Sequence, residues 1–537
     1  MRKWAPIISL SAAQFVMVLD TTVMNVSLTQ VVEDLDTTVA DLQLAITFYA
    51  LTMAAFMLTG GKLGDVLGRR RTFGIGMVVY GVGSLITALS PNLAMLLVGW
   101  SLIEGLGAAL VIPAILALTA GNYQGRDRAV AYGVLGGIAA AGAAVGPLLG
   151  GLATEYLSWR VVFAGETVVM VLLLIFVRVI ADAPAARRPR IDVLSVVLSA
   201  LGLSLVVLAI LKSSEWGWVE PKGGPQIGGE TVSPLGISLV PWLIVSGLCV
   251  LVLFLRRQEQ LESSGRDALL RASMLRIPQL RSGMVTLAVQ QLVLNGTFFV
   301  VPVYLQVVLG KDALDTGLKI LPLSAGVIAF ALAGARMSAH RSPRSIVRDG
   351  YLTMTAGNLL LAAAVTLQLD DALFLLGMFV FGAGTGLASS QLANVIMSSV
   401  GDDEAGEAGG MQGTAQYLGA SLGTALIGAA LLSGLAGGLT TRIEQNPSLS
   451  AQEQAAVSSA TAAGVPVASD DQVREALAQT TLGAEQQDAV ADDYADAQLQ
   501  ALRRSLLLAG LLALSGLLFV RRLPGRPLAR APDCAAA

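Results

Sequence analysis

The sequence predicts an all-α polytopic membrane protein, and three observations support this fold class. Of its 537 residues, 54% are hydrophobic and only 14% are charged, and the mean hydropathy is +0.68. A soluble protein of this length would carry about a quarter of its residues as charges. Apolar runs of about 20 residues, long enough to cross a bilayer, recur along the chain. Glycines recur at helical spacing inside one of these runs, from Gly133 to Gly151.

The apolar runs predict fourteen transmembrane helices. We place them near residues 5–28, 42–60, 73–90, 93–119, 130–152, 161–180, 192–211, 235–255, 283–309, 316–339, 346–368, 371–398, 405–434 and 501–520. An even number of spans puts both termini on the same side of the membrane.

The basic residues indicate which side that is. Of the 35 Lys and Arg residues, 26 fall in segments on the same side as the N-terminus when the fourteen spans are threaded in order. Short cytoplasmic loops are enriched in Lys and Arg. We therefore expect a bacterial inner-membrane protein with both termini in the cytoplasm.

The glycine run predicts a helix that packs closely against other helices. Residues four apart lie on one face, so a pair of glycines at that spacing lets another backbone approach. Proline inside the run removes a backbone donor and bends the helix. The residues that define this run are Gly133, Gly142, Gly146, Pro147, Gly150 and Gly151.

The same glycine spacing occurs again later in the chain, which predicts an internal repeat. Gly410, Gly419 and Gly423 follow Gly133, Gly142 and Gly146 at an offset of 277 residues. This offset also carries the first predicted helix onto the ninth, near residue 283. We therefore expect two six-helix halves that rock about a central site. The expected divisions are 1–181 and 283–520 for the halves, 182–282 for an inserted helix pair with its connector, and 521–537 for a cytoplasmic tail.

Three motifs resemble those of a known family. The segment Gly61–Arg71, Gly-Lys-Leu-Gly-Asp-Val-Leu-Gly-Arg-Arg-Arg, resembles the signature loop of the major facilitator superfamily. The glycine run resembles the motif of its antiporter branch, and Leu19–Val26 is similar to the motif of the fourteen-helix drug:proton antiporters. The resemblance implies a major facilitator fold and proton-coupled export of amphipathic or cationic small molecules by alternating access.

The signature loop predicts a conformational latch. A carboxylate at Asp65 is placed to meet the N-terminal end of a neighbouring helix or a nearby Arg, for about 1–2 kcal/mol. Glycine allows a tight turn in this loop. The residues assigned to the latch are Gly61, Asp65, Gly68, Arg69 and Arg70. Alternatively, the arginines serve only as topology anchors. The corresponding loop of the second half, from Gly334 to Arg344, lacks the Asp, so a latch there would be weaker.

Three acidic residues fall inside predicted spans: Asp20, Glu104 and Glu166. An ionisable group at membrane depth costs at least ~2.5 kcal/mol, so each is a candidate for function. A carboxyl group in an apolar cavity takes up a proton more readily than one in water, and can release it when the cavity fills with water. We expect these three residues to couple proton movement to transport, with Asp20 first and Glu104 second.

Each acid also has a purely structural interpretation. Asp20 could be bonded permanently to the hydroxyl groups of Thr21 or Thr22. Glu104 could be the partner of another polar group, and Glu166 could pair with Arg160 at the outer rim. The resemblance is imperfect here, because the family motif has Arg where this chain has Ser101 and Gln where it has Glu104. The family's usual proton relay therefore does not carry over, which leaves open whether Glu104 takes that role, whether a substrate cation meets it, or whether the chain is an uncoupled facilitator.

Neutral polar residues inside the spans are candidates for the substrate cavity, because their amides can bind a substrate. Equally, they can hydrogen-bond between helices as packing contacts. These candidates are Asn25, Gln290, Gln291, Asn295, Gln391 and Asn394. His340, the only histidine, falls at the cytoplasmic rim, where we expect a solvated side chain rather than a pH switch.

The outer segment 435–500 is rich in Ala and Gln and carries ten acidic residues against two arginines. Ser450 with Glu453, and Ser469 with Gln472, have the spacing of helix capping boxes, so we expect a partly helical cap. This cap either gates exit or docks a partner, or it is a passive insertion. The basic segment from Arg256 to Arg281 is expected to form an amphipathic connector on the cytoplasmic face.

Several classes of function are excluded or disfavoured. No nucleotide-binding loop or catalytic constellation is present in the sequence, and the two cysteines form no metal cluster, so we expect no enzyme, no metal and no cofactor. The expected partners are protons, membrane lipids and a small-molecule or lipid substrate, with no nucleic acid, and the expected state is a monomer. An exporter or flippase for a lipid or glycolipid is the main alternative, and a non-transporting sensor or scaffold is a further one.

Overall fold

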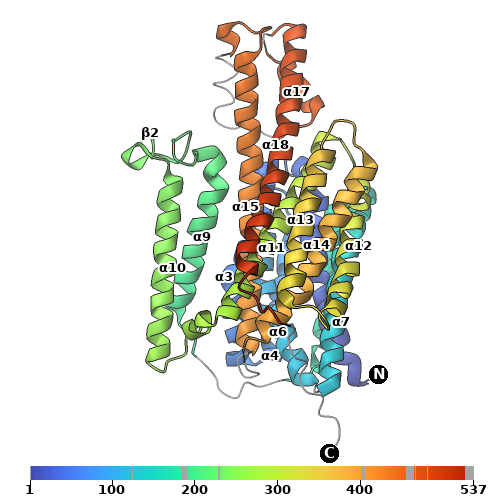
Figure 1. Cartoon of the computed structure of the whole chain (residues 1–537), viewed down its shortest axis with the longest axis vertical. Helices are drawn as coiled ribbons and strands as arrows, with labels where there is room; N and C mark the ends of the chain where they lie inside the picture. The colour runs from blue at the N-terminus through green and yellow to red at the C-terminus, as the bar shows by residue number, and fades with distance from the viewer. Residues whose placement is uncertain are drawn as a thin grey trace, which may run out of the picture.

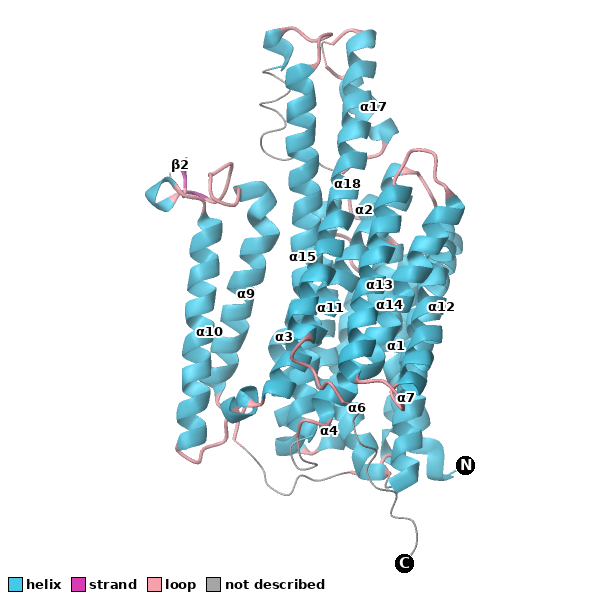
Figure 2. Cartoon of the chain, viewed as in Figure 1, coloured by secondary structure: helices cyan, strands magenta, loops and turns pink. Residues whose placement is uncertain are grey.

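The computed structural model of the chain is almost entirely helical (Figure 2). It describes residues 2–526 apart from 124, 183–189, 228–229, 401–404, 455–464, 466 and 481. In this part of the chain the strands are β1 (Gln226–Ile227) and β2 (Glu230–Thr231), which pair as a short antiparallel hairpin. The predicted all-α class is confirmed.

The helices of the first half follow one another through short connections. They are η1 (Arg2–Trp4), α1 (Ala5–Val26), α2 (Leu28–Asp34), α3 (Val39–Leu67), α4 (Arg69–Ala88), α5 (Leu93–Leu96), η2 (Leu97–Glu104), α6 (Gly105–Asn122), α7 (Gly125–Tyr156), α8 (Trp159–Phe176) and η3 (Val177–Val179). The segments α5, η2 and α6 form one continuous span.

The inserted pair and the second half complete the chain. Their helices are α9 (Val193–Trp216), η4 (Pro234–Gly236), α10 (Leu239–Ser263), η5 (Ala272–Arg276), α11 (Pro278–Pro302), η6 (Val303–Val308), α12 (Ala313–Met337), α13 (Pro343–Ala364), α14 (Asp371–Met397), α15 (Ala405–Gln445), α17 (Asp470–Ala478) and α18 (Ala484–Val520).

A helix lies at each of the fourteen predicted spans, but the count of fourteen membrane crossings is not confirmed. Among the described residues, 12 helices are long and apolar enough to cross a membrane. The helices α7 and α13 are not among them. Both pack on neighbouring helices, α7 on α1 and α12, and α13 on α14 and α18. The number of crossings therefore stays a prediction.

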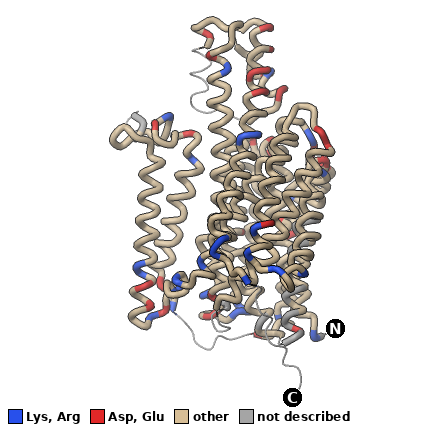
Figure 3. Tube along the Cα trace, in the orientation of Figure 1, with Lys and Arg blue, Asp and Glu red and all other residues tan. Residues whose placement is uncertain are grey.

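The helices form one bundle with two additions (Figure 1). The pair α9 and α10 stands at the side of the bundle, and α15 and α18 extend together beyond it at one end. The chain starts at the opposite end. Many Lys and Arg residues lie toward that opposite end, while Asp and Glu residues gather on the extension (Figure 3). This distribution follows the predicted orientation, in which the extension faces outward.

The glycine face of α7 is a contact surface between the two halves of the bundle. A Cβ atom added at Gly142 would lie 3.1 Å from Val18 of α1, and one added at Gly150 would lie 3.0 Å from Val23 of α1. A Cβ atom added at Gly151 would lie 2.6 Å from the carbonyl oxygen of Ala313 in α12. The helix thus packs on α1 through one set of glycines and on α12 of the second half through another.

The remaining residues of the predicted run take part in the same packing or lie beside it. Gly146 faces Thr22 of α1, and the carbonyl of Pro147 lies 2.4 Å from the Cβ position of Gly317 in α12. Gly133 lies within α7, and its surroundings are outside the described side chains. The predicted contact surface is therefore present where the structure describes it.

The second half repeats this arrangement. The helix α15 packs on α11 of its own half and on α3 of the first half, as α7 packs on α1 and α12. Gly142 approaches the carbonyl oxygen of Phe15, and Gly419 approaches that of Ala288. Gly142 and Gly419 are related by the predicted offset, but Phe15 and Ala288 are not. Consistently, α11 begins at Pro278, earlier than the predicted residue 283.

The inserted helix pair packs on the bundle, and an ion pair joins its two helices at one end. Apolar residues of α9 such as Leu203 and Val207 pack on Leu51 of α3 and Ala425 of α15. At the end of the pair nearest the chain termini, the Arg257 side chain donates hydrogen bonds to both carboxylate oxygens of Asp192, each 2.7 Å long. This guanidinium holds the pKa of the Asp192 carboxyl, which precedes α9, well below its usual range.

The connector packs back against the membrane-spanning helices. The Gln258 side chain accepts hydrogen bonds from the backbone N–H groups of Leu269 and Leu270, which are both buried. The Arg271 side chain then pairs with Glu407 at the start of α15, at 2.9 Å. The apolar residues of this basic segment thus face the protein, as an amphipathic connector requires.

The outer segment forms a helical stalk, as its capping boxes predict. The helix α15 spans 41 residues, about 60 Å at 1.5 Å per residue, which is twice a hydrocarbon core. Arg442 on α15 pairs with Asp496 on α18 at 2.9 Å. The capping box of Ser469 with Gln472 is formed at the start of α17, and Ser450 and Glu453 exchange the corresponding hydrogen bonds.

The packing of α7 on α12 predicts a position-dependent effect of one methyl group. In Gly151→Ala the new Cβ would lie 2.6 Å from a backbone oxygen, so α7 and α12 must separate. We expect a loss of about 1–3 kcal/mol of stability, as for other overpacked contacts, measured as a lower thermal unfolding midpoint in detergent. Gly137→Ala is the matched control. Gly137 lies in the same helix as Gly151, and a Cβ atom there meets nothing within 4 Å. Equal midpoints for the two variants would contradict this packing.

Candidate functional site

The three acidic residues predicted from the sequence lie together in the first half. Each of them offers a carboxylate oxygen, and these oxygens all lie within 4.8 Å of one another. Asp20 and Glu104 are 0% exposed and Glu166 is 2% exposed. They come from α1, the end of η2, and α8, three segments far apart in the sequence. We call Asp20, Glu104 and Glu166 the carboxyl cluster.

Glycines bring the helices of the cluster close together. A Cβ atom at Gly83 of α4 would lie 2.5 Å from the backbone nitrogen of Glu104, and one at Gly107 would lie 2.4 Å from that of Tyr80. The span that carries Glu104 is also widened, because η2 is a π-helix that ends at this residue. Wide turns of this kind occur often at functional sites. The backbone thus places Glu104 directly against α4.

Two aromatic side chains donate hydrogen bonds to the cluster. The indole Nε1 of Trp100 donates to Asp20 Oδ1 at 2.8 Å, and the Tyr80 hydroxyl donates to Glu166 Oε2 at 3.3 Å. The other oxygen of each of these carboxyl groups is buried without a hydrogen-bond partner, and so are both oxygens of Glu104. The cluster therefore retains unused capacity to bind a proton or a cation.

The structural alternatives for Asp20 and Glu166 do not describe this arrangement. Thr21 and Thr22 donate their hydroxyl hydrogens to backbone carbonyls of α1 rather than to Asp20. Arg160 pairs with Asp34 and also donates to the carbonyl of Ser90. The expected alternative pairing of Glu166 with Arg160 is therefore wrong, because Asp34 at the outer rim takes the guanidinium.

Within the described part of the chain, the cluster has no basic partner: none of the ion pairs found there includes any of its three members. Carboxylate oxygens at this spacing are also ligands that a metal ion accepts. The chemistry open to the cluster is thus the binding of protons or of a small cation.

Among the described residues of the second half, no such cluster of acidic side chains is found. Gly83 packs on the backbone of Glu104, and Gly357 of α13 packs in the same way on Phe381 of α14. Phe381 therefore stands where the first half has Glu104. It is fully buried, and α14 is a regular α-helix at this position.

The other two acids also have apolar counterparts. Counting from the paired contacts of Phe15 and Ala288 places Val293 at the position of Asp20. The Thr167 hydroxyl donates to Gly81, and the Thr355 hydroxyl donates to Gly510 between the corresponding helices α13 and α18. This register places Ala509 at the position of Glu166. The three positions that carry carboxyl groups in the first half are thus apolar at their equivalents in the second half.

Ser101, which replaces the basic residue of the family motif, has a packing contact. Its hydroxyl donates to the carbonyl of Ala45 in α3 at 2.8 Å, and its side chain is buried. It therefore holds η2 against α3.

Of the predicted cavity residues, two bond between helices of the second half. The Gln290 side chain donates to the Thr385 carbonyl of α14, and the Gln391 side chain donates to the Gly334 carbonyl of α12. The carbonyl oxygens of both amides are buried without partners. The amide nitrogens of Gln290 and Gln391 therefore make hydrogen bonds between helices, as expected if these residues serve in packing.

The other predicted cavity residues bond locally or are exposed. The Asn25 amide donates to the carbonyl of Thr21 within α1, and the Asn295 amide donates to the backbone and the side chain of Gln291 within α11. Asn394 is exposed. A role for any of them in substrate binding stays a prediction. His340 is exposed beyond the end of α12, where a solvated side chain is expected.

The signature loop contains the expected ion pair, but in a weak form. Asp65 Oδ1 lies 3.4 Å from an Arg69 side-chain nitrogen, and both side chains are about a third exposed. Such a pair is worth about 0.5 kcal/mol, less than the expected 1–2 kcal/mol. Gly61 contributes close helix packing, with its Cβ position 3.8 Å from Pro113 of α6.

A different carboxylate meets the start of α4. Asp182, which follows η3, accepts a hydrogen bond from the backbone N–H of Arg70 at 3.1 Å. Gly68, with φ of +99°, makes the turn that exposes this helix end, and its Cβ position lies 3.1 Å from Asp182. The Arg70 side chain donates to the Ile180 carbonyl. Contacts between the loop and the end of α8 thus add to the predicted pair.

Sequence patterns did not identify the aromatic frame of the cluster. Tyr49 stacks on Trp100 with ring centroids 4.8 Å apart, and its hydroxyl is buried without a hydrogen-bond partner. Trp100 and Tyr80 lie within apolar spans, where a buried N–H or O–H requires an acceptor. This need for a buried acceptor is the feature of the sequence that could have linked Trp100 and Tyr80 to the acidic residues.

Comparison of the sequence with known proteins shows that the chain is similar to transporters. The family model of the Major Facilitator Superfamily matches residues 10–424. A puromycin resistance protein of Streptomyces alboniger is 31% identical over 431 residues, which cover 79% of this chain and 81% of that protein. A tetracenomycin C resistance and export protein of Streptomyces glaucescens is 28% identical over 436 residues, which cover 80% and 76%.

Solved structures share the fold. A bacterial homologue of the human lysosomal transporter Spinster, in an inward-facing and unoccupied conformation, superposes with a TM-score of 0.62 at 14% identity and covers 99% of both chains. A D-xylose–proton symporter superposes with a TM-score of 0.56 at 13% identity and covers 80% of this chain and 90% of that one.

The signature loop yields a prediction that separates transport from stability. Asp65→Asn removes an ion pair worth about 0.5 kcal/mol, so expression and thermal midpoint should stay close to those of the unmodified protein. We expect a slower rate of export in reconstituted vesicles, because the loop loses its charge at a moving boundary. Asp127→Asn is the control, since Asp127 forms another ion pair with Lys3, one that is more exposed than the pair of Asp65 with Arg69. Unchanged export by Asp65→Asn would contradict the latch.

Proposed function

Because the chain belongs to the major facilitator superfamily, we propose that it is a proton-coupled antiporter that exports amphipathic or cationic small molecules by alternating access. The carboxyl cluster carries the proton, and the relatives named for drug resistance and export support a drug efflux transporter. The observation that carries the proposal is the burial of three carboxyl groups within 4.8 Å of one another.

The electrostatics of the cluster support proton binding. Like charges at this spacing, with little water between them, repel strongly, so the three groups do not all ionise together. They titrate as one coupled unit, and a proton is shared among them. When water or a substrate cation reaches the cluster, the ionised form becomes more favourable and a proton leaves. The hydrogen bonds from Trp100 and Tyr80 hold two of the carboxyl groups in place meanwhile.

Contacts between the halves support alternating access. The described hydrogen bonds that join the halves lie toward the end where α1 and α11 finish. There the Gln306 side chain accepts from both the backbone and the hydroxyl of Thr29, and donates to the carbonyl of Val26. Farther along α3, the Gln43 side chain donates to the carbonyl of Thr424 in α15. These bonds close the outer side in the predicted orientation, and rocking of the halves would break them.

The substrate class follows from two considerations. Buried carboxyl groups favour a cation over an anion. The relatives named for puromycin and tetracenomycin C make these two compounds the first natural products to test. A lipid or glycolipid substrate of the same fold becomes the working hypothesis if no small molecule is moved.

The proposal is tested in liposomes with an imposed pH gradient. We expect gradient-driven movement of ethidium, a fluorescent lipophilic cation, and of puromycin by the unmodified protein. In Asp20→Asn the rate should fall to the rate without a gradient, because an amide cannot carry the proton. Glu104→Gln and Glu166→Gln show whether the other members of the cluster are also required.

The control is Glu33→Gln, which changes an exposed carboxyl group on α2 outside the cluster and should leave transport unchanged. Parallel assays with a chelator and without sodium separate protons from metal ions as the coupled species. Full gradient-driven transport by the variant with all three amides would overturn the proposal. Transport that requires a metal ion or sodium would assign the cluster to that cation instead.

A further inference from the structure

Two grooves on the membrane-facing surface occupy equivalent places in the two halves. The first, of about 460 Å³, lies between α4 and α8. The second, of about 400 Å³, lies between α13 and α18. Both lie at the end of the bundle where the chain starts, which is the cytoplasmic rim in the predicted orientation.

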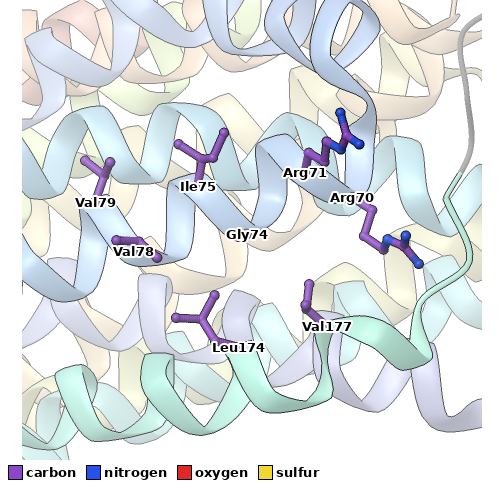
Figure 4. Close-up of a pocket in the computed structure, with 8 residues that line it drawn as sticks. All are labelled: Arg70, Arg71, Gly74, Ile75, Val78, Val79, Leu174 and Val177. Carbon is purple, nitrogen blue, oxygen red and sulfur yellow. The ribbon is translucent and has the colours of Figure 1, made fainter.

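The first groove has apolar walls and a basic end. Figure 4 shows Arg70 and Arg71 at one end, with Val78, Leu174 and Val177 along the groove. Val78 is 50% exposed, and its helix α4 is long and apolar enough to cross a membrane. An open apolar groove at this depth is filled by hydrocarbon rather than by water.

Three lining positions of the helix α4 have counterparts in the lining of the second groove. Arg70, Arg71 and Gly74 precede Gly83 by the same numbers of residues as Arg344, Ser345 and Arg348 precede Gly357. Gly83 and Gly357 are equivalent, because each packs on the neighbouring span of its own half. Arg70, Arg71 and Gly74 line the first groove, and their counterparts Arg344, Ser345 and Arg348 line the second.

The facing helices match in the same way. Thr167 and Gly510 are equivalent contacts of α8 and α18, and from them Leu174 and Val177 correspond to Leu517 and Val520. All four apolar residues line the grooves. The next residue along the chain is an arginine in both halves, Arg178 after Val177 and Arg521 after Val520.

Both grooves are positively charged at their ends. At the first, Arg70 and Arg71 line the groove and Arg178 directly follows the lining residue Val177, while the carboxylate of Asp182 is bound to the start of α4. The ion pairs of the described residues include neither Arg71 nor Arg178, and both side chains are exposed.

At the second groove, Arg344, Arg348 and Arg521 stand against Asp349. That carboxylate pairs with Arg348 at 3.0 Å, and also with Arg341 outside the groove. The Arg344 side chain donates to the Leu523 carbonyl, and Arg521 is exposed. The first half thus combines an apolar groove with arginines at its end, and the second half combines the apolar residues Leu517 and Val520 with three arginines in one groove.

We propose that these two grooves bind anionic phospholipids of the cytoplasmic leaflet, one in each half. An acyl chain lies between the third and sixth spans of the half, and the phosphate meets the arginines. Guanidinium groups bind phosphate through paired, charge-assisted hydrogen bonds, and basic pockets at the cytoplasmic side attract acidic headgroups. Charge complementarity and the hydrocarbon walls together select a lipid over a soluble anion.

The test is native mass spectrometry of the full chain in detergent with added lipid. We expect phosphatidylglycerol to be retained at up to two molecules per protein, one for each groove, and phosphatidylcholine with the same acyl chains to be lost. Gly74→Phe should remove one retained lipid, because a Cβ at Gly74 meets nothing within 4 Å and the ring fills the first groove. Gly165→Phe is the matched control, since Gly165 is equally open on α8 but lines neither groove.

Charge variants test the basic ends without altering the walls. The double variant Arg71→Gln with Arg178→Gln should lose one retained lipid, and Arg71→Lys should keep it because the charge remains. Arg521→Gln should weaken retention in the second groove. Arg266→Gln, in the exposed part of the connector, should leave both lipids bound. These variants decide the question if Gly74→Phe does not fold.

Three results would overturn the proposal. The first is equal retention of phosphatidylcholine and phosphatidylglycerol. The second is retention of both lipids by Gly74→Phe or by the double charge variant. The third is release of the lipid by excess inorganic phosphate, which would show a site for the anion alone rather than for a lipid.

Discussion

Three carboxyl groups within 4.8 Å of one another in the interior of a membrane protein place a strict limit on their charge. The cluster forms no ion pair with a basic residue of the described chain, so bound protons or a cation must neutralise it. The surrounding structure follows from holding these groups in place. Gly83 and Gly107 let α4 approach the backbone of the span that carries Glu104, the π-helix η2 ends at that residue, and Trp100 fixes Asp20. In our proposal, this cluster links proton movement to export.

The two halves share an architecture but not a chemistry. Glycine packing relates α7 on α1 to α15 on α11, and Gly83 on Glu104 to Gly357 on Phe381. The residues equivalent to the three acids are apolar in the second half. A repeat that keeps its packing while losing its ionisable groups fits a division of roles, in which one half handles protons and both halves move. The paired surface grooves show that features outside the interior are shared as well.

Much of this arrangement was predictable from the sequence, because the membrane limits what the chain can do. Apolar length predicted the helices, and the glycine spacing predicted that α7 packs closely on other helices, whereas only the fold identifies these as α1 and α12. The cost of a buried charge identified Asp20, Glu104 and Glu166 separately. That their three carboxyl groups lie close together could not be predicted, because it depends on the rotation of three helices about their axes and on a π-helical turn. No residue pattern in the sequence indicates such a turn. For the same reason, the sequence suggested Arg160 as a partner for Glu166, whereas the fold gives that arginine to Asp34. The weak contribution of Asp65 also depends on solvent exposure, which only the fold determines.

The most direct test of the central claim is to measure proton release when substrate binds. Purified protein in weakly buffered detergent solution is mixed with ethidium, or with puromycin, beside a pH-indicating dye. We expect proton release that saturates with substrate and disappears when Asp20, Glu104 and Glu166 are all changed to their amides. Undiminished release from that triple variant, or binding of either compound by the unmodified protein without any release, would contradict a proton-carrying role for the cluster.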